Sequence, residues 1–288
     1  MQNRLFLKLA LSFCIFFQVS FLAFSQEKSL LWKISGNGLS KDSYLFGTIH
    51  IICKEDFVMN DRVKKAFEST SKLVMELDMS DPQLMAKMQQ QSLNPGMKNI
   101  QAELSEEDAK VMDVFFMENF GAGLAQIGIL KPFVLSSMAL IKTLPCPETE
   151  SFEGYFTSQA QSLSKPIEGL ETVEIQMGTF DQIPAKVQLD ELVKMIREKS
   201  GAEEFDRMVK SYLSEDIDAL YQIMNQDGMM KEYRGIMLDN RNKAWIPQLQ
   251  EKMAKESLFV AVGSGHLAGE YGVISLLRKA GYQVEPVN

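Results

Sequence analysis

The chain is poor in the side chains that most often carry enzyme chemistry. Of its 288 residues only two are histidines, His50 and His266, and three are cysteines. Imidazole is the commonest metal ligand and the usual acid–base group near neutral pH, so both histidines become candidates for a functional site. Neither Cys53 nor Cys146 belongs to a C-x-x-C motif, and a structural zinc site or a thioredoxin-like redox role is therefore unsupported.

An excess of basic residues is also absent. The chain has 30 lysines and arginines against 38 acidic residues, which gives a net charge of −8 at pH 7. Nucleic acids and anionic membranes are bound through a concentrated basic face, whereas the basic residues here are scattered among acids. We therefore expect no nucleic-acid partner. No repeat or low-complexity linker divides the sequence, and its hydrophobic fraction of 45% suits a globular core.

The N-terminal residues contain one long apolar run. Arg4 and Lys8 lie before it or at its start, and it covers residues 9–24 and ends in small residues at the positions that a signal peptidase reads. A permanent anchor is the alternative, but about 16 residues are fewer than the roughly 20 that span a bilayer. We predict a signal peptide over residues 1–25 and one mature domain over residues 26–288. This domain would have no stable membrane span and be exported to the periplasm or the extracellular space.

Export would place Cys53 and Cys146 in an oxidising space, where two cysteines can pair. The alternatives are a disulfide, which we favour, and two buried thiols. The closed loop would contain about 90 residues, for which loop-closure entropy gives roughly 4–5 kcal/mol of stabilisation.

Apolar patterning predicts a mixed α/β (α+β) fold. Its sheet is built from N-terminal and C-terminal strands, and the middle region, about residues 105–249, is largely helical. The last segments form a βαβ unit. The expected strands cover residues 29–35, 43–47, 73–77, 165–170, 258–262 and 282–286, with Gly36-Asn37-Gly38 as the turn of an N-terminal hairpin.

Several helices have recognisable ends. Residues 81–91 are expected to form one with Asp81 as N-cap and Pro82 at its first position, and Ser105 is expected to cap another. Residues 232–249 and 269–280 are also expected to be helical. The residues of the Ser105 helix expected to face the core are Val111, Val114, Phe115 and Met117.

The two histidines occupy equivalent positions. His50 and His266 each come three residues after a glycine, in Gly47-Thr48-Ile49-His50 and Gly263-Ser264-Gly265-His266, directly behind an apolar strand. Strand ends that open into glycine turns are where α/β proteins gather ligands. The alternative is two unrelated surface or capped histidines.

Glu76 is the expected third member of the site. It lies within the apolar segment Leu73–Leu77, where a buried carboxylate is costly unless a cation or several donors compensate it. Two histidines and one glutamate would hold a divalent metal ion such as zinc, manganese or cobalt and leave a position open for water. The alternative, an edge strand that turns Glu76 to solvent, fits the periodicity equally well.

Arg241 and Glu171 are weaker candidates for catalytic roles. A guanidinium can bind a carboxylate ligand or a developing oxyanion, although an arginine on a charged helix is usually solvated. Glu171 follows an expected strand, and by residue type alone it would stabilise a helix N-terminus.

These blocks, in their order and spacing, resemble the TraB/GumN family, which is related to the Tiki metalloproteases. The blocks are Tyr44–His50, Met75–Asp78, Gly169–Thr172, Arg241-Asn242 and Val262–Leu267, followed by Gly272 and Gly281-Tyr282. The resemblance implies a mixed α/β fold with a helical middle. For the Tiki branch it implies a metal-dependent peptidase that uses two G-x-x-H histidines, a glutamate and an arginine, here His50, His266, Glu76 and Arg241.

Two other enzyme classes are disfavoured. The glycines in Gly263-x-Gly265-x-x-x-Gly269 are spaced one residue too widely for a dinucleotide fingerprint, and Ser264 has no G-x-S-x-G surroundings. We therefore predict an exported metal-dependent hydrolase of the peptidase type that acts on a peptide or protein. The alternative is a non-catalytic exported protein that sequesters a peptide or a metal-containing ligand.

Overall fold

The computed structural model of the chain describes residues 28–226 and 228–288, and the predicted signal peptide lies outside them. A mixed sheet collects strands from both ends of the chain, whereas most helices come from the middle, which confirms the predicted fold class. The strands are β1 (Leu31–Ser35), β2 (Ser43–Thr48), β3 (Ile52–Cys53), β4 (Lys72–Met75), β5 (Thr149–Glu150), β6 (Ile167–Gly169), β7 (Leu258–Gly263) and β8 (Gln283–Pro286). The helices are α1 (Asp61–Ser69), α2 (Leu84–Gln91), α3 (Glu106–Phe120), α4 (Leu124–Ile127), α5 (Pro132–Thr143), α6 (Phe152–Ser162), α7 (Val173–Asp181), α8 (Ala185–Glu198), α9 (Gly201–Leu213), α10 (Ile217–Met224), α11 (Gly228–Arg234), α12 (Asn240–Met253) and α13 (Val273–Lys279).

The main sheet has the strand order β6-β4-β7-β2-β1-β8. β1 is antiparallel to both of its neighbours, β2 and β8, whereas the neighbouring strands β6, β4, β7 and β2 are parallel to one another. The carboxyl ends of these four strands therefore meet at one edge of the sheet, which is where open α/β sheets bind ligands. β7, α13 and β8 form the predicted βαβ unit, with β2 and β1 between its two strands.

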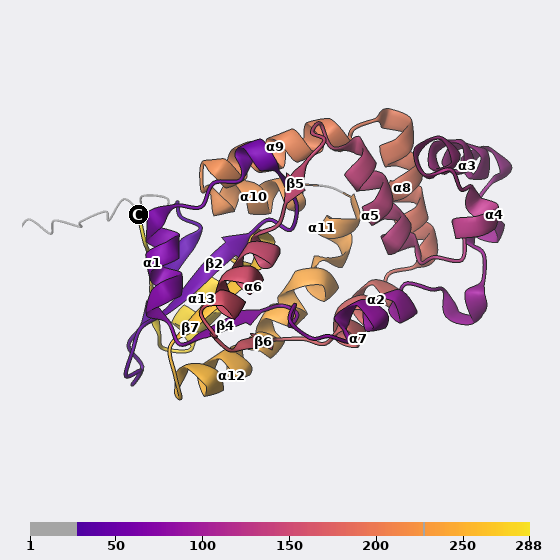
Figure 1. Ribbon diagram of the computed structural model, residues 1–288. Coiled ribbons are helices and arrows are strands. Elements are labelled where there is room, and N and C mark those ends of the chain that lie inside the picture. Colours follow the sequence, from indigo (N-terminus) through magenta and orange to yellow (C-terminus); the bar gives the residue numbers. More distant parts are fainter. Residues whose placement is uncertain (1–27, 227) are drawn as a thin grey trace, which may run out of the picture.

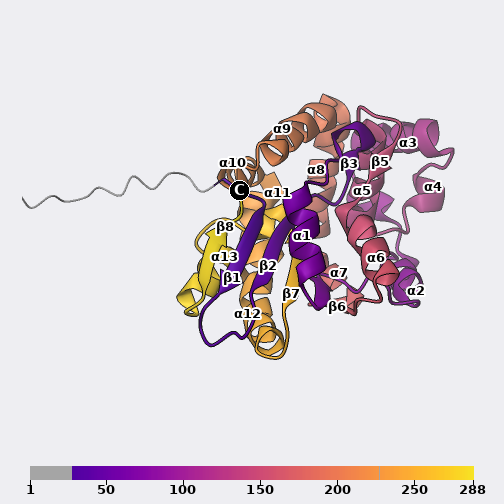
Figure 2. The same ribbon diagram turned by 60° about the vertical axis from the view of Figure 1, so that its left-hand side comes forward.

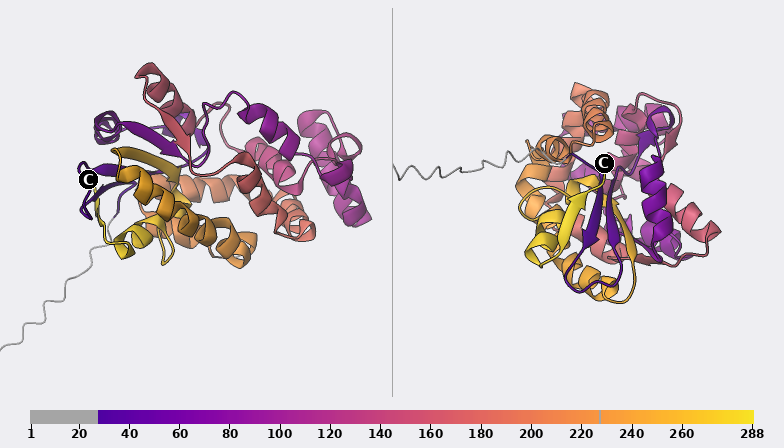
Figure 3. Two further views of the ribbon diagram at one scale, coloured as in Figure 1. Left: turned by 90° about the horizontal axis from the view of Figure 1, so that it is seen from below. Right: turned by 90° about the vertical axis from the view of Figure 1, so that its left-hand side faces the viewer.

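Helices cover both faces of the sheet. α1 and α6 lie over one face, and α12 and α13 lie over the other (Figure 3). On the α1 and α6 side, Phe46, Phe67, Phe156 and Phe259 pack together with ring centroids 4.9–6.1 Å apart. Burying each such ring contributes roughly 1.5–3 kcal/mol. This aromatic cluster therefore fixes β2 and β7, the two strands that lead to the histidines, against the helices.

Glycines shape the N-terminal hairpin at two places, its turn and the end of its second strand. The predicted turn at Gly36-Asn37-Gly38 is confirmed, and its three residues have φ values of 78°, 46° and 80°, a region that glycine adopts without strain. At the end of β2, a side chain on Gly47 would place its Cβ 2.9 Å from Leu267 and 3.2 Å from Ser264. Glycine is required there because the loops after β2 and β7 approach each other closely.

Four helices of the middle region form a separate group beside the sheet. α3, α4, α5 and α8 lie together to one side of it (Figures 1 and 2) and have their own buried cluster. The cluster consists of Ile100, Ala109, Met112, Phe116, Leu124, Leu135, Ala139, Leu189, Leu192 and Val193. Within residues 28–226 and 228–288, no helix has the length and apolarity needed to cross a membrane.

The predicted core face of α3 is wrong in part. Phe115 packs against the helical cluster and Val111 is half-buried, as predicted. Val114 and Met117, however, are exposed, and the buried residues are Ala109, Met112 and Phe116. Apolar residues occur on several faces of this helix, so spacing alone does not select one. Packing against α8 selects the i, i+3, i+7 set. The predicted N-cap is confirmed, because the Ser105 hydroxyl accepts a hydrogen bond from the Asp108 amide.

Three of the predicted helices differ from those in the structure. α2 begins at Leu84 instead of Pro82, because the Asp81 carboxylate accepts from the Gln83 amide and forms a turn of its own. The single helix expected over residues 232–249 is interrupted by a π-helical segment, η4 (Gly235–Asp239), between α11 and α12. The last helix begins at Val273 instead of residue 269, where glycine has φ +87°.

Cys53 and Cys146 form a disulfide with a Cα–Cα distance of 5.8 Å, which confirms the favoured prediction. Cys53 ends β3, which pairs with β5, and β5 leads directly into α6. The disulfide therefore ties the segment after His50 to the beginning of α6. The bridged residues are 93 positions apart in the sequence.

We expect the Cys53→Ala/Cys146→Ala variant to be less stable than the wild type by up to about 4–5 kcal/mol, because the unfolded chain loses a long closed loop. Urea unfolding of both proteins measures this difference. Reductant serves as the control, since it should destabilise the wild type and leave the variant unchanged. Equal stabilities of oxidised wild type and variant would contradict the prediction.

Candidate functional site

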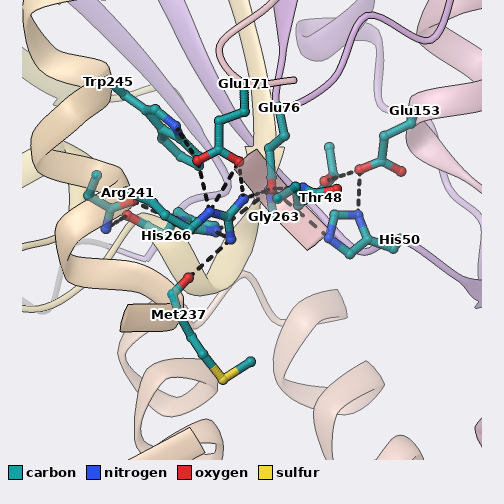
Figure 4. A network of polar contacts seen from close by, with 12 residues as sticks. Thr48, His50, Glu76, Glu153, Glu171, Met237, Arg241, Trp245, Gly263 and His266 are labelled. Atoms are coloured by element: carbon teal, nitrogen blue, oxygen red, sulfur yellow. Dashed lines mark hydrogen bonds and ion pairs between the residues drawn. The ribbon is translucent and has the colours of Figure 1, made fainter. Parts of the chain in front are cut away.

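A polar side chain follows the end of each of the four parallel strands. His50 follows β2, Glu76 follows β4 directly, Glu171 follows β6, and His266 ends the short 3-10 turn Ser264–His266 after β7. The side chain of Arg241, in the first turn of α12, extends to the same edge of the sheet and pairs with Glu76. The structure thus brings together all five residues that the sequence singled out (Figure 4).

Glu76 is buried, with 7% of its surface exposed, which excludes the alternative that it faces solvent. Its Oε1 accepts from the Gly263 amide at 2.9 Å, and its Oε2 accepts from Arg241 at 2.6 Å and from Gln176 at 3.0 Å. Burial would raise the pKa of this carboxyl, but the nearby His266, His50 and Arg241 and the Gly263 amide lower it to about 2. Arg241 therefore supplies a cation that compensates this buried carboxylate without a metal ion.

Both histidines direct Nε2 toward the same oxygen of Glu76. The distance to Glu76 Oε1 is 4.0 Å from His50 Nε2 and 3.8 Å from His266 Nε2. Ligands of a tetrahedral ion with bonds of about 2.0–2.1 Å lie ~3.4 Å apart. Each imidazole nitrogen is therefore roughly half an ångström too far from Glu76 Oε1 for the two atoms to bind the same tetrahedral ion. Accordingly, in the described part of the chain no group of three or more His, Cys, Asp or Glu side chains is already arranged to hold a metal ion.

The Nδ1 atom of His50 is held by Glu153, in the first turn of α6. It lies 2.9 Å from Glu153 Oε1, which also accepts from the Thr48 hydroxyl at 2.5 Å, while Oε2 accepts from the Ser151 hydroxyl at 2.9 Å. A carboxylate only accepts, so His50 Nδ1 carries a proton. Sequence reasoning missed Glu153, because an acid in the first turn of a helix after a serine N-cap has an ordinary structural explanation.

The Nδ1 atom of His266 is held by Asn242, which lies next to Arg241 on α12. The Asn242 amide nitrogen donates to the backbone oxygens of His266 and Tyr271, so its Oδ1, 2.5 Å from His266 Nδ1, is an acceptor. His266 is thereby fixed as the tautomer with its lone pair on Nε2. Its ring also lies against that of Trp245, with centroids 4.5 Å apart.

The environments of the two imidazoles differ. Burial lowers the pKa of His266 to about 3, so this ring is neutral at pH 7. The side chain of His50 is 67% exposed. The protein around it would lower its pKa, but the hydrogen bond to Glu153 and the charges of Glu153 and Glu76 outweigh this effect and raise the pKa to about 9. One imidazole is therefore a buried neutral group and the other an accessible cation.

Arg241 joins Glu76 to Glu171. Its Nε and Nη2 donate to both oxygens of Glu171 at 2.8–3.1 Å, and its Nη1 donates to the Met237 carbonyl at 3.0 Å and lies 3.3 Å from His266 Nε2. Met237 belongs to the π-helical segment η4, a feature often found at functional sites. Every nitrogen of the guanidinium is thus engaged with the protein.

Glu171 does not stabilise a helix N-terminus, although its residue type predicts that role. The Thr172 hydroxyl caps α7 by accepting from the Ile175 amide, and the Glu171 carboxylate turns instead toward Arg241. It also accepts from the indole N–H of Trp245 at 3.0 Å. Glu171 is therefore a buried partner of Arg241.

A cavity of about 270 Å³ opens beside these groups. It is lined by His50, Met75, Glu76, Leu77, Met79, Met88, Ser151, Glu153, Gln176 and Ala261. The glycine at position 263 keeps space free beside two of these residues: a Cβ there would lie 3.2 Å from Glu76 Oε1 and 3.4 Å from His50 Nε2. His266 Nε2 lies 3.8 Å from the same Glu76 oxygen. Two imidazole nitrogens and a carboxylate oxygen are a donor set that fits a divalent transition metal.

Comparison with known proteins agrees with the resemblance seen in the sequence blocks. The chain matches the model of the TraB/PrgY/gumN family over residues 30–286. It is 22% identical to metalloprotease TIKI2 of Danio rerio, over 97% of this chain and 67% of that protein, and 22% identical to metalloprotease TIKI1 of the same organism, over 91% and 63%. An uncharacterized protein of Treponema pallidum is also 22% identical, over 88% of this chain and 82% of its own length. No solved structure matches.

Proposed function

Because the chain belongs to the TraB/PrgY/gumN family and is distantly related to the TIKI metalloproteases, we propose that it is a metal-dependent peptidase. His50, Glu76 and His266 would be its metal ligands. The observation that carries the proposal is the convergence of two Nε2 atoms on one carboxylate oxygen, with both Nδ1 atoms held by acceptors. Such acceptors behind the imidazoles are the usual support of histidine ligands.

A divalent ion held by these three side chains would supply Lewis acidity for the hydrolysis of a peptide bond. The remaining groups prepare the ligands. Glu153 holds the proton on His50 Nδ1 and so directs Nε2 toward Glu76, and Asn242 does the same for His266. The exposed edge of His50 and the adjoining cavity leave access for a peptide.

Arg241 and Glu171 act as positioning residues in this proposal. The Arg241 nitrogens donate to Glu76, Glu171 and Met237, which leaves none directed at the cavity to stabilise an oxyanion. Arg241 instead keeps Glu76 ionised and fixed in orientation, and Glu171 fixes Arg241. Of the two roles considered for Arg241, binding a carboxylate ligand and stabilising an oxyanion, this proposal takes the first.

The proposal includes export, to the periplasm or the extracellular space. Its supports are the N-terminal apolar run after Arg4 and the disulfide between Cys53 and Cys146, a bond that persists mainly in oxidising compartments.

The direct test is peptide cleavage by the purified full-length mature chain. A mixed peptide library is incubated with protein that has been chelated and then reloaded with zinc, manganese or cobalt, and products are identified by mass spectrometry. Cleavage should depend on the added metal and stop with chelator. Cleavage by the chelated protein would contradict the metal-dependent mechanism.

A second function, metal-independent capture of a peptide, is favoured by one observation. The charge of Glu76 is already balanced by Arg241 without a metal ion. A binding protein of this kind would retain peptides in the presence of chelator and release no products, so the same library distinguishes the two functions.

Gly263→Ala probes the space between the proposed ligands. The backbone at this position, with φ −50° and ψ 134°, accepts alanine, but the new Cβ would lie between Glu76 Oε1 and His50 Nε2. We expect metal affinity to fall by about 10–100-fold, as for other perturbed surroundings of metal ligands, with little change in thermal stability. Gly235→Ala is the matched control, because no atom lies within 4 Å of its added Cβ. Equal metal affinities of the two variants would count against the site.

A further inference from the structure

The cavity beside Glu76 is lined by two chemically different groups of residues. The polar group contains the proposed ligands His50 and Glu76, together with Ser151, Glu153 and Gln176. The apolar group consists of Met75, Leu77, Met79, Met88 and Ala261. We call this second group the methionine pocket.

The methionine pocket combines buried residues of the sheet with exposed methionines. Met75 and Ala261, on β4 and β7, are fully buried, whereas Met79 and Met88 have 40% and 36% of their surface exposed. Methionine is unbranched and polarizable, and it adapts to apolar groups of different shapes. Two exposed methionines beside a polar centre therefore provide a surface suited to an apolar group from outside.

We propose that the methionine pocket binds one apolar side chain of the peptide substrate, of leucine or methionine type, beside the bond that is cleaved. This inference rests on the proposed peptidase function and adds its specificity. The size agrees: a cavity of about 150 Å³ holds a benzene ring, so the 270 Å³ available here admits one large side chain with its adjoining backbone.

Charge also favours an apolar side chain over a charged one. An acidic side chain would enter next to the acidic side chains of Glu76 and Glu153, which line the same cavity. A basic side chain would find the oxygens of both already accepting hydrogen bonds, from Arg241 and His50 among others, and its charge would lose water against the methionines.

The cavity lies where the sheet meets the helical region. The ligands follow strands of the sheet, whereas Met88 lies on α2 and Gln176, which also lines the cavity, on α7. α2 and α7 pack against each other within the helical region. In this arrangement the sheet provides the proposed ligands and most of the methionine pocket, and the helical region completes the pocket with Met88.

The test uses one peptide series and four proteins. Each position of a cleaved or bound peptide is replaced in turn by leucine, methionine, alanine or aspartate. The proteins are the wild type, Met88→Glu, Met88→Leu and Met85→Glu. Met85 is the matched control because it lies on the same helix, is 74% exposed and does not line the cavity. Cleavage is followed by mass spectrometry, and binding by displacement of a fluorescent peptide from metal-loaded and from chelated protein.

At one peptide position we expect leucine and methionine to exceed aspartate by about 10–200-fold in kcat/KM or in affinity. Met88→Glu should remove this preference, whereas Met88→Leu and Met85→Glu should keep it. Preferential binding without cleavage would support the pocket and overturn the peptidase function. Cleavage without preference at any position, or equal effects of Met88→Glu and Met85→Glu, would overturn the pocket. Failure to bind or cleave any peptide would overturn both.

Discussion

Replacing His266 with alanine is expected to weaken divalent-metal binding by more than about 100-fold and to abolish metal-dependent cleavage. Loss of a group that merely supports a ligand typically costs 10–100-fold in affinity, and loss of a ligand should cost more. His266 is buried, its tautomer is fixed by Asn242, and its Nε2 faces Glu76 at 3.8 Å. Competition with a metal-sensitive dye measures the affinity.

Asn242→Ala provides an intermediate case. It keeps the His266 imidazole but removes the acceptor that fixes Nδ1, so metal affinity should fall by about 10–100-fold. Circular dichroism and thermal unfolding establish that both variants are folded. If His266→Ala bound metal as tightly as Asn242→Ala or the wild type, His266 would not be a ligand.

Replacing Arg241 with methionine is expected to lower the free energy of unfolding by about 3–5 kcal/mol, the usual effect of removing one partner from a buried ion pair. Two buried carboxylates, Glu76 and Glu171, would lose their shared cation. Denaturant unfolding at pH 7 with chelator present measures the loss and keeps any added metal from replacing the missing charge.

Arg197→Met is the control for this prediction. Arg197 also bridges two acids, Glu107 and Asp108, but its side chain is 40% exposed, and pairs of this kind contribute about 0–1 kcal/mol. Combining Arg241→Met with Glu171→Gln should recover part of the lost stability, because one of the two unpaired charges is then removed. Equal effects of Arg241→Met and Arg197→Met would contradict the account of the buried network.

The strands that position the site could be predicted because each has a clear local signal. The segments 43–47 and 258–262 are apolar and end in glycine turns, and both form strands whose neighbouring ends place His50 and His266 near Glu76. Periodicity left the orientation of Glu76 open, because facing the site and facing solvent follow the same pattern. The tertiary contacts with Gly263 and Arg241 decide it.

The supporting residues could not be predicted, since their roles depend on helices packed from distant parts of the chain. Glu153 begins a helix and Asn242 lies within one, positions with ordinary structural explanations. Their contacts with His50 and His266 exist only because α6 and α12 pack on opposite faces of the sheet. The same dependence on packing explains the partly wrong core face of α3 and the unpredicted π-helical segment before Arg241.

The most direct measurement of the central claim is elemental analysis of the wild type beside the His50→Ala/His266→Ala variant. Both proteins are loaded with excess zinc, manganese or cobalt under identical conditions and then freed of unbound metal. The account predicts one divalent ion per wild-type chain and almost none in the folded variant. Equal metal content in the two proteins, or no metal retained by the wild type, would contradict it.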